Sequence, residues 1–404
     1  TFPILGQCDS DPLELFKVLA ARQADAAHRT FIDTGSHAII SVSPELFFRL
    51  DGNRIVTRPM KGTAGRYPDP LEDPKIAETL RQSAKERAEN LMIVDLIRND
   101  LGRIAETGSV RVESLFDVER YQTLHTMTST ISATTHAKVP DIFAALFPSG
   151  SVTGAPKIRT MQIIDELEVR PRGPYCGAIG WWGPNRQAEF SVGIRTMVID
   201  RETRTATYRV GSGITWDSEP HAEYDECTLK AAVLAETDPE FDLLESMRLE
   251  NGTYWLFDRH LQRLAQGADY FGYPYDEQFV REELKRTARD SPRGTRKVRL
   301  LLSRTGKVAI TIEPLGSART WRVALAKTPI QSQSPFVYSK TTHRPHYTAA
   351  FRDHANVDDI ILFNGDGELT ESTRANLVLD IDGAAYTPPR SAGLLPGTFR
   401  EELL

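Results

Sequence analysis

Residues 85–104 read KERAENLMIVDLIRNDLGRI. Their apolar positions recur at helical spacing, and we expect one long helix over residues 73–100. Glu86 and Glu89 are three residues apart, so a helix places both carboxylates on one face. An apolar run at 91–97 follows directly. The stretch therefore predicts a helix that is largely buried beside its two glutamates.

A second pair of glutamates repeats this spacing. Glu223 and Glu226 lie in a helix that we expect over residues 219–237. Either pair alone would usually be a solvated face. Like charges held close together repel unless a cation neutralises them, and oxygen ligands without thiols suit Mg²⁺. The two pairs together predict a Mg²⁺ site.

An anion-binding element accompanies the glutamates. Arg195 lies in a strand expected over 189–199, and Gly211 and Gly213 lie in RVGSGI (209–214). A guanidinium fork and exposed backbone amides bind a carboxylate well, although one arginine on a strand is more often a surface charge. We expect an anionic small molecule held between Mg²⁺ and Arg195.

Two lysines stand in segments that suggest covalent chemistry. Lys61 lies in RPMKGT (58–63) and Lys340 in YSKTTHR (338–344). A lysine amine becomes a nucleophile only where its surroundings lower its pKa. The alternative for Lys61 is an exposed lysine in a turn. The sequence thus suggests two separate reaction sites on one chain.

The composition is that of a globular protein of 404 residues, 40% hydrophobic and 26% charged. This length exceeds one ordinary core and predicts two domains, with three as the alternative. The net charge of −6 argues against a nucleic-acid partner, and no apolar run is long enough to cross a membrane. Three scattered cysteines predict reduced thiols in a cytoplasmic protein.

Strands and helices follow one another without regular βαβ alternation, which predicts the α+β class. The polar break ETDPEF (236–241) divides the chain into domains at 1–236 and 241–404. The chain starts at Thr1 without methionine and ends in EELL (401–404), which resembles the opening turn of a helix. We therefore expect a fragment whose first domain lacks its N-terminal part and whose second lacks its C-terminal part.

Four ordered runs in the first domain carry a family resemblance: residues 85–104, FPSGSVTGAPKIRTMQIIDELE (147–168), RGPYCGAIGW (172–181) and VGSGITWDSEPHAEYDEC (210–227). They closely resemble the chorismate-utilising enzymes, of which the large components of anthranilate synthase and aminodeoxychorismate synthase are the nearest kinds. The resemblance implies antiparallel sheets flanked by helices. It also implies Mg²⁺ between the glutamate pairs and a chorismate carboxylate.

The resemblance extends to individual residues. Glu89 and Glu226 would be direct Mg²⁺ ligands, and Glu86 and Glu223 would act through water. The residues implied in substrate binding are Tyr175, Arg195, Gly211 and Gly213 for another carboxylate, with His125 near the ring and Thr153 in the same site.

Lys61 separates members of this family. Anthranilate synthases carry alanine here and aminodeoxychorismate synthases carry lysine. By resemblance, Lys61 attacks the chorismate ring as the C4 hydroxyl leaves, and ammonia then displaces the lysine. Glu45, in SPELF (43–47), matches the family's general acid. Anthranilate synthase remains the alternative; isochorismate synthases use a lysine as a base, within a less similar motif.

The ammonia needs a source. No glutaminase pattern of Cys, His and Glu accompanies Cys8, Cys176 or Cys227. We therefore expect a separate glutaminase subunit that supplies ammonia from glutamine.

Four further runs follow in the second domain: LLESMRLENGTYWLFDRHLQRL (243–264), SKTTHRPHY (339–347), FNGDGELTESTRANLVL (363–379) and TPPRSAGLLPGTFR (387–400). They resemble the class IV pyridoxal-phosphate enzymes, which include aminodeoxychorismate lyase and branched-chain aminotransferase. By resemblance, Lys340 forms the Schiff base with pyridoxal 5'-phosphate, and Glu371 pairs with the pyridine nitrogen. Arg263 and the turn that ends at Thr398 would hold the phosphate.

The two resemblances describe consecutive reactions of p-aminobenzoate (folate) synthesis. The first domain would make 4-amino-4-deoxychorismate from chorismate and ammonia, and the second would release pyruvate and leave p-aminobenzoate. A transaminase or a catalytically inactive second domain are the alternatives. Class IV enzymes commonly build the site across a dimer, so the sequence leaves open a homodimer through the second domain.

Overall fold

The computed structural model describes residues 1–404 apart from 24–25, 235–238, 292, 317–318, 353 and 355. The chain forms two compact units. The first consists of Thr1–Arg66 and Ile76–Asp238, and the second of Tyr67–Lys75 and Pro239–Leu404. The boundary expected at 236–241 lies partly outside the described residues.

Two antiparallel sheets form the framework of the first unit. One has the strand order β1-β12-β11-β3-β2; the other has the order β6-β8-β5-β4-β10-β9, with β7 paired to β8. The strands are β1 (Phe2–Gln7), β2 (His28–Asp33), β3 (His37–Ser43), β4 (Leu46–Asp51), β5 (Arg54–Arg58), β6 (Met60–Gly65), β7 (Arg111–Arg120), β8 (Leu124–Thr134), β9 (Ala178–Gly183), β10 (Gln187–Val192), β11 (Thr196–Asp200) and β12 (Thr205–Val210). The helices are α1 (Pro12–Arg22), α2 (Asp73–Gln82), α3 (Ala84–Gly102), α4 (Val139–Leu146), α5 (Gly150–Thr153), α6 (Lys157–Leu167), α7 (Pro220–Ala231) and η1 (Ala232–Leu234).

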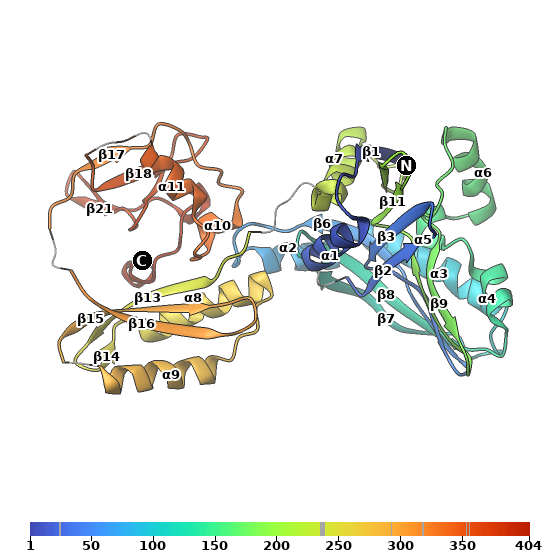
Figure 1. The fold of residues 1–404 in the computed structure, drawn as a ribbon, viewed down its shortest axis with the longest axis horizontal. Helices are drawn as coiled ribbons and strands as arrows, with labels where there is room; N and C mark the ends of the chain where they lie inside the picture. Colours follow the sequence, from blue (N-terminus) through green and yellow to red (C-terminus); the bar gives the residue numbers. More distant parts are fainter. Residues whose placement is uncertain (24–25, 235–238, 292, 317–318, 353, 355) are drawn as a thin grey trace. The chain divides into compact units, whose positions relative to one another are not determined.

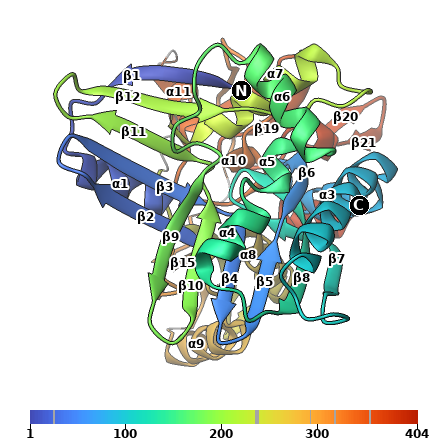
Figure 2. The ribbon, with the colours of Figure 1, turned by 90° about the vertical axis from the view of Figure 1, so that its right-hand side faces the viewer.

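Helix α3 lies at the centre of the first unit's main core. Its residues Ile93, Ile97 and Leu101 recur at helical spacing and are buried. They belong to one cluster with Phe48 of β4 and Ile131 of β8. Figure 2 shows α3 and α4 on one face of the larger sheet. The packing places α3 beside β6, the strand that carries the RPMKGT lysine.

The prediction of a single helix over 73–100 is wrong, because two helices, α2 and α3, cover this segment. Ser83 separates them: its backbone ψ of 115° is not helical, and its hydroxyl accepts a hydrogen bond from the Glu86 backbone N–H at 3.4 Å. Serine is a preferred N-cap because its oxygen satisfies an otherwise unpaired N–H. Glu86 consequently lies in the first turn of α3.

The prediction of a single strand over 189–199 is also wrong. Its residues form β10 in the larger sheet and β11 in the five-stranded sheet, so the chain passes from one sheet to the other between them. Arg195 lies at this passage with a left-handed φ of 48°. Such a backbone is uncommon for a residue with a side chain. The helix expected over 219–237 is α7 followed by the 3₁₀ turn η1, and its end falls outside the described residues.

The second unit contains a four-stranded antiparallel sheet in the order β14-β13-β15-β16. Its elements are β13 (Leu243–Glu250), β14 (Thr253–Tyr254), α8 (Phe257–Phe271), α9 (Glu277–Asp290), β15 (Thr295–Leu302) and β16 (Val308–Pro314). Figure 1 shows α8 and α9 on one face of this sheet. Met247, Val298 and Leu300 pack there with Leu261 and Leu284 of the helices.

An Asn-Gly turn joins β13 to β14 in a hairpin. Asn251 and Gly252 have φ angles of 49° and 85°, and β13 pairs antiparallel with β14. Two positive φ values match the type I′ turn that this dipeptide favours.

The remainder of the second unit contains two small sheets and short helices. Strand β17 is parallel to β18, which pairs antiparallel with β19, and β20 pairs with β21. The elements are β17 (Val323–Leu325), α10 (Pro335–Tyr338), α11 (Pro345–Arg352), β18 (Asp359–Phe363), β19 (Leu369–Ser372), β20 (Leu379–Ile381), β21 (Ala384–Tyr386), η2 (Arg390–Ala392) and α12 (Thr398–Leu403).

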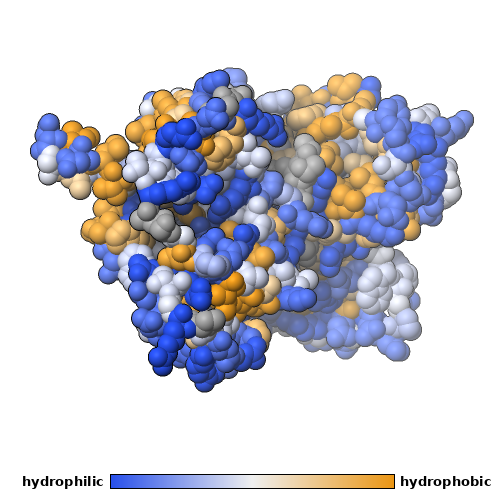
Figure 3. All heavy atoms as spheres, turned by 60° about the vertical axis from the view of Figure 1, so that its left-hand side comes forward, coloured by the Kyte–Doolittle hydropathy of each residue, from blue (hydrophilic) through white to orange (hydrophobic). Residues whose placement is uncertain are grey.

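Both units mix helices with mainly antiparallel sheets, which confirms the predicted α+β class. Hydrophilic and hydrophobic residues are interspersed over the face seen in Figure 3. None of the helices in the described part of the chain combines the length and the apolar character needed to cross a membrane.

Candidate active sites

The first unit contains a cavity of about 910 Å³. Residues of β6, α3, α5, α6, β12 and α7 line it. It gathers most of the residues predicted from the sequence for the first site: Glu45, Lys61, Glu86, Glu89, Thr153, Tyr175, Arg195, Gly211, Gly213, Glu223 and Glu226. Segments that lie far apart in the sequence thus meet around one space.

His125 is the exception among the predicted residues. Its neighbours on β8, Leu124 and Thr126, line the cavity, whereas His125 is buried and does not. Its contact with the ring stays a prediction, and this arrangement does not support it.

Lys61 points into the cavity from β6. Its side chain is only 19% exposed, and its Nζ lies 3.9 Å from Oε2 of Glu89. A Cβ built on Gly213 would lie 2.4 Å from that Nζ, far inside van der Waals contact. Glycine at 213 therefore lets the backbone approach the lysine nitrogen.

Glu45 carries a carboxyl group that is a weaker acid than an ordinary glutamate. The residue is 3% exposed, and its Oε1 is buried without a hydrogen-bond partner. Burial raises the pKa of Glu45 to about 7, against the smaller opposing effects of hydrogen bonds from Ser151 and the Met60 backbone. A buried carboxyl group with this pKa can hold a proton near neutral pH and donate it.

Three of the four predicted Mg²⁺ ligands, Glu86, Glu89 and Glu226, are close enough for their charges to interact. Burial raises the pKa of Glu86, and the charges of Glu89 and Glu226 raise it further. Oε2 of Glu223 is buried without a hydrogen-bond partner. Such a set of carboxylates is suited to a cation.

The glutamates do not form a complete metal cage. In the described residues, no three acidic, histidine or cysteine side chains are grouped closely enough to hold a metal. Mg²⁺ usually keeps several waters and takes further oxygens from its substrate. The residues present therefore fit a Mg²⁺ ion whose coordination is completed by other oxygens.

Arg195 and Tyr175 line the cavity as the predicted carboxylate-binding pair. Nη1 of Arg195 donates to Oε1 of Gln23 at 3.3 Å, and the guanidinium lies 5.7 Å from the Tyr121 ring centroid. Burial lowers the pKa of Arg195. Among the described residues Arg195 has no acidic partner, so its charge is available to an anionic ligand.

In the second unit, Lys340 lies between a pocket of about 10 Å³ and a wider cleft of about 540 Å³. Its backbone carbonyl accepts a hydrogen bond from the Leu244 N–H at 2.8 Å, which fixes the lysine segment to β13. Burial lowers the pKa of Lys340 to about 8, and the charges of Arg263 and Arg344 act in the same direction. The amine is therefore partly neutral in mildly basic solution.

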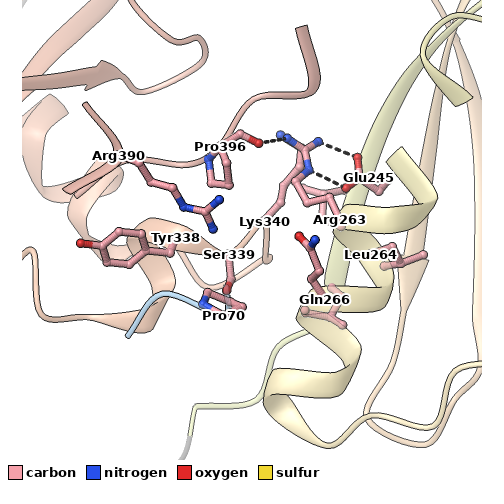
Figure 4. Close-up of a pocket in the computed structure, with 13 residues that line it drawn as sticks. Pro70, Glu245, Arg263, Leu264, Gln266, Tyr338, Ser339, Lys340, Arg390 and Pro396 are labelled. Atoms are coloured by element: carbon pink, nitrogen blue, oxygen red, sulfur yellow. Dashed lines mark hydrogen bonds and ion pairs between the residues drawn. The ribbon is translucent and has the colours of Figure 1, made fainter. Parts of the chain in front are cut away.

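Arg263 projects from α8 into the small pocket (Figure 4). Its Nε and Nη2 donate to the two carboxylate oxygens of Glu245 at 2.8 and 2.7 Å, and Nη1 donates to the Pro396 carbonyl at 3.0 Å. Pro396 belongs to the turn that leads to Thr398. The predicted phosphate-binding arginine and turn are thus in direct contact.

Glu371 is held by three donors. Its Oε1 accepts from the Tyr347 hydroxyl at 2.6 Å and from the Leu395 N–H at 3.2 Å, and its Oε2 accepts from Nδ2 of Asn376 at 3.3 Å. Burial raises the pKa of Glu371 to about 7. Lys340, Arg263 and Glu371 supply an amine, a guanidinium and a carboxyl group, which are the groups that pyridoxal phosphate requires.

A family model described as chorismate binding enzyme matches residues 1–236, more than half of the chain. The chain belongs to the chorismate binding enzyme family. A second model, amino-transferase class IV, matches residues 242–404. The chain therefore joins a chorismate binding enzyme domain to a class IV aminotransferase domain.

Relatives of this chorismate binding enzyme match its first domain. Over 235 residues it is 43% identical to an aminodeoxychorismate synthase from Streptomyces griseus, covering 57% of this chain and 32% of that protein. It is 46% identical over 211 residues to aminodeoxychorismate synthase component 1 from Escherichia coli, covering 52% of this chain and 46% of that protein. The chain thus spans less than half the length of these relatives.

A solved structure shares the fold of the chorismate binding enzyme domain. Anthranilate synthase component I from Streptococcus pneumoniae is 33% identical, with a TM-score of 0.53, covering 58% of this chain and 52% of that one.

Sequence reasoning missed several residues of these sites. Lys230 forms an ion pair with Glu226 at 2.5 Å. The spacing of four residues on a helix predicts such a pair, so the sequence contained this information. Glu245 and His260 form a buried pair at 2.7 Å, and His260 also lies 3.4 Å from the Thr398 hydroxyl. Their pairing depends on a strand and a helix packing together, which no local pattern encodes.

Proposed function

We propose that the first domain converts chorismate and ammonia into 4-amino-4-deoxychorismate and water. The observation that carries this proposal is that Lys61 and Glu45 line one cavity with four glutamates. The relatives named aminodeoxychorismate synthase support it.

Each residue then has a defined task. The Lys61 amine attacks the chorismate ring, and Glu45 gives its proton to the C4 oxygen, which leaves as water. Ammonia adds next and displaces the lysine nitrogen, so the ring carries one amino group in place of the hydroxyl. The raised pKa of Glu45 keeps the needed proton in place near neutral pH.

The anionic groups of chorismate have two candidate partners. Arg195 and Tyr175 bind one carboxylate, helped by the backbone of Gly211 and Gly213. Glu89 and Glu226 would hold Mg²⁺ directly, and Glu86 and Glu223 would hold it through water; the ion would supply positive charge opposite the other carboxylate. Without a cation, the glutamates would repel that carboxylate.

Ammonia comes from a separate glutaminase subunit in this proposal. The relative from Escherichia coli is named component 1, which implies a second component. Burial raises the pKa of Cys176, the cysteine that lines the cavity, to about 11, so it is not a thiolate nucleophile near neutral pH. The three cysteines are free and buried, in keeping with the reducing cytoplasm.

We further propose that the second domain converts 4-amino-4-deoxychorismate into p-aminobenzoate and pyruvate. The C3–O bond breaks, the C4 hydrogen leaves as a proton, and the ring becomes aromatic; the enolpyruvate released takes up a proton to give pyruvate. Pyridoxal phosphate, when bound, supplies an electron sink for loss of the C4 proton. Lys340, with its lowered pKa, is the base in place to accept that proton.

Mass-spectrometric product analysis tests both reactions at once. The protein is incubated with chorismate, Mg²⁺ and ammonium, with and without pyridoxal phosphate. We expect 4-amino-4-deoxychorismate without the cofactor and p-aminobenzoate with it. Anthranilate as the main product would refute the first proposal, and an unchanged product pattern with cofactor would refute the second.

A further inference from the structure

The wider cleft beside Lys340 is strongly basic. It contains four positively charged side chains besides that lysine: Lys297, Arg299, Arg344 and Arg374. No aspartate or glutamate is among the described residues that line it. Its volume of about 540 Å³ is within the range of small-molecule sites.

The sheet places two of these cations in the cleft. Alternate residues of β15 face opposite sides, and Val298 and Leu300 are buried against the helices. Lys297 and Arg299 therefore emerge on the other side. Arg299 stands directly opposite Ser246 of β13, which also lines the cleft.

In the described part of the chain, the guanidinium groups of the cleft form no ion pair with an acidic side chain. Arg344 donates to the Thr341 carbonyl at 2.9 Å and lies over the Tyr347 ring, and Arg374 lies over the Trp321 ring. Within the described residues, neither these two nor Arg299 has an acidic partner. Lys297 is different, because its Nζ lies 3.3 Å from Glu313.

A cofactor phosphate does not account for this charge. The predicted phosphate residue, Arg263, lines the small pocket and not the cleft. Arg263 is also already paired with Glu245. Three guanidinium groups without acidic partners repel one another in one cleft. An anionic ligand bound between them would reduce this repulsion.

We propose that this cleft is the substrate site of the second domain and that it selects a molecule with two carboxylates. Arg299 on the sheet and Arg344 before α11 each bind one carboxylate. The inference rests on the proposed lyase function, because 4-amino-4-deoxychorismate carries one carboxylate on its ring and one on its enolpyruvyl group. An aliphatic amino acid with one carboxylate leaves one of these arginines unpaired.

Binding of stable probes tests the site without turnover. Isophthalate carries two carboxylates on a ring and benzoate carries one. With the full chain loaded with pyridoxal phosphate, calorimetry should show isophthalate binding at least about tenfold more tightly than benzoate, with a strong salt dependence. Equal affinity for the two probes would overturn the proposal.

Two variants and a control assign the arginines. Arg299→Gln and Arg344→Gln should each weaken isophthalate binding about tenfold or more and affect benzoate less. Arg289→Gln, an exposed arginine on α9, should change neither. Cofactor absorbance reports whether each variant still binds pyridoxal phosphate. Unchanged isophthalate affinity in both variants would refute the assignment.

Turnover separates this inference from the proposed function. If the wild-type chain forms p-aminobenzoate, both variants should raise KM for 4-amino-4-deoxychorismate more than they lower kcat. If it forms none, the lyase function fails, while a retained preference for isophthalate still supports a dicarboxylate site.

Discussion

The two carboxylate oxygens of Glu245 accept hydrogen bonds from Nε and Nη2 of Arg263 at 2.8 and 2.7 Å. Glu245 is almost completely buried. Burial alone would raise the pKa of Glu245, but Arg263 and His260 outweigh it and bring it to about 2. A bidentate pair fixes the plane of a guanidinium. One carboxylate thus orients the predicted phosphate-binding arginine.

We expect Glu245→Gln to weaken pyridoxal phosphate binding about tenfold, because Arg263 loses a charge-assisted partner. Titration followed by cofactor absorbance measures the change, and circular dichroism checks the fold. Glu250→Gln, on the same strand but exposed, is the control. Wild-type affinity in a folded Glu245→Gln variant would contradict the positioning role.

Lys61→Ala should lower formation of 4-amino-4-deoxychorismate at least about a thousandfold, because the covalent route is lost. Chromatography of the products measures it. Lys17→Ala, on the exposed side of α1, should retain full activity. Undiminished amination by a folded Lys61→Ala variant would eliminate the lysine-nucleophile mechanism.

Amination should decline as the pH rises through about 7, because the acid form of Glu45 is the proton donor and its pKa is about 7. The assay keeps free ammonia constant, since ammonia itself increases with pH. Glu45→Gln should lower the rate about a hundredfold or more and remove this titration. A variant that keeps the wild-type pH profile would show that another group titrates.

Lys230→Gln should tighten Mg²⁺ binding severalfold. Nζ of Lys230 lies 2.5 Å from Oε1 of Glu226, so Lys230 competes with Mg²⁺ for this carboxylate. Its positive charge also repels the metal ion. Calorimetry without substrate measures the affinity, with Lys17→Gln as the control. Glu223→Gln should weaken binding, and an opposite order of the two variants would refute the metal assignment.

Attachment of pyridoxal phosphate should accelerate as the pH rises toward about 8 and level off above it. The neutral amine of Lys340 is the reactive form, and its pKa is lowered to about 8. Stopped-flow absorbance follows the reaction, and Lys340→Ala should show no attachment. A rate that still rises steeply above pH 9 would indicate an ordinary lysine pKa.

Local sequence patterns drew attention to most of the predicted residues that line the cavity of the first unit. Spacing predicted that Glu86 and Glu89 share one helix face, and both line the cavity together with Gly211 and Gly213 of RVGSGI. Such features depend on a few neighbouring residues. Where local signals competed, the prediction was wrong: Ser83 capped a new helix inside an expected one.

The sequence by itself determined which chemical groups the protein carries: two motif lysines, two glutamate pairs and the residues that place the chain in its family. Tertiary structure decided how those groups are held. The turn of Arg195 between two sheets, the Glu245–Arg263 pair and the basic cleft at Arg299 all join distant segments. Burial and pairing across such segments set each side chain's orientation and pKa, and a linear pattern contains neither.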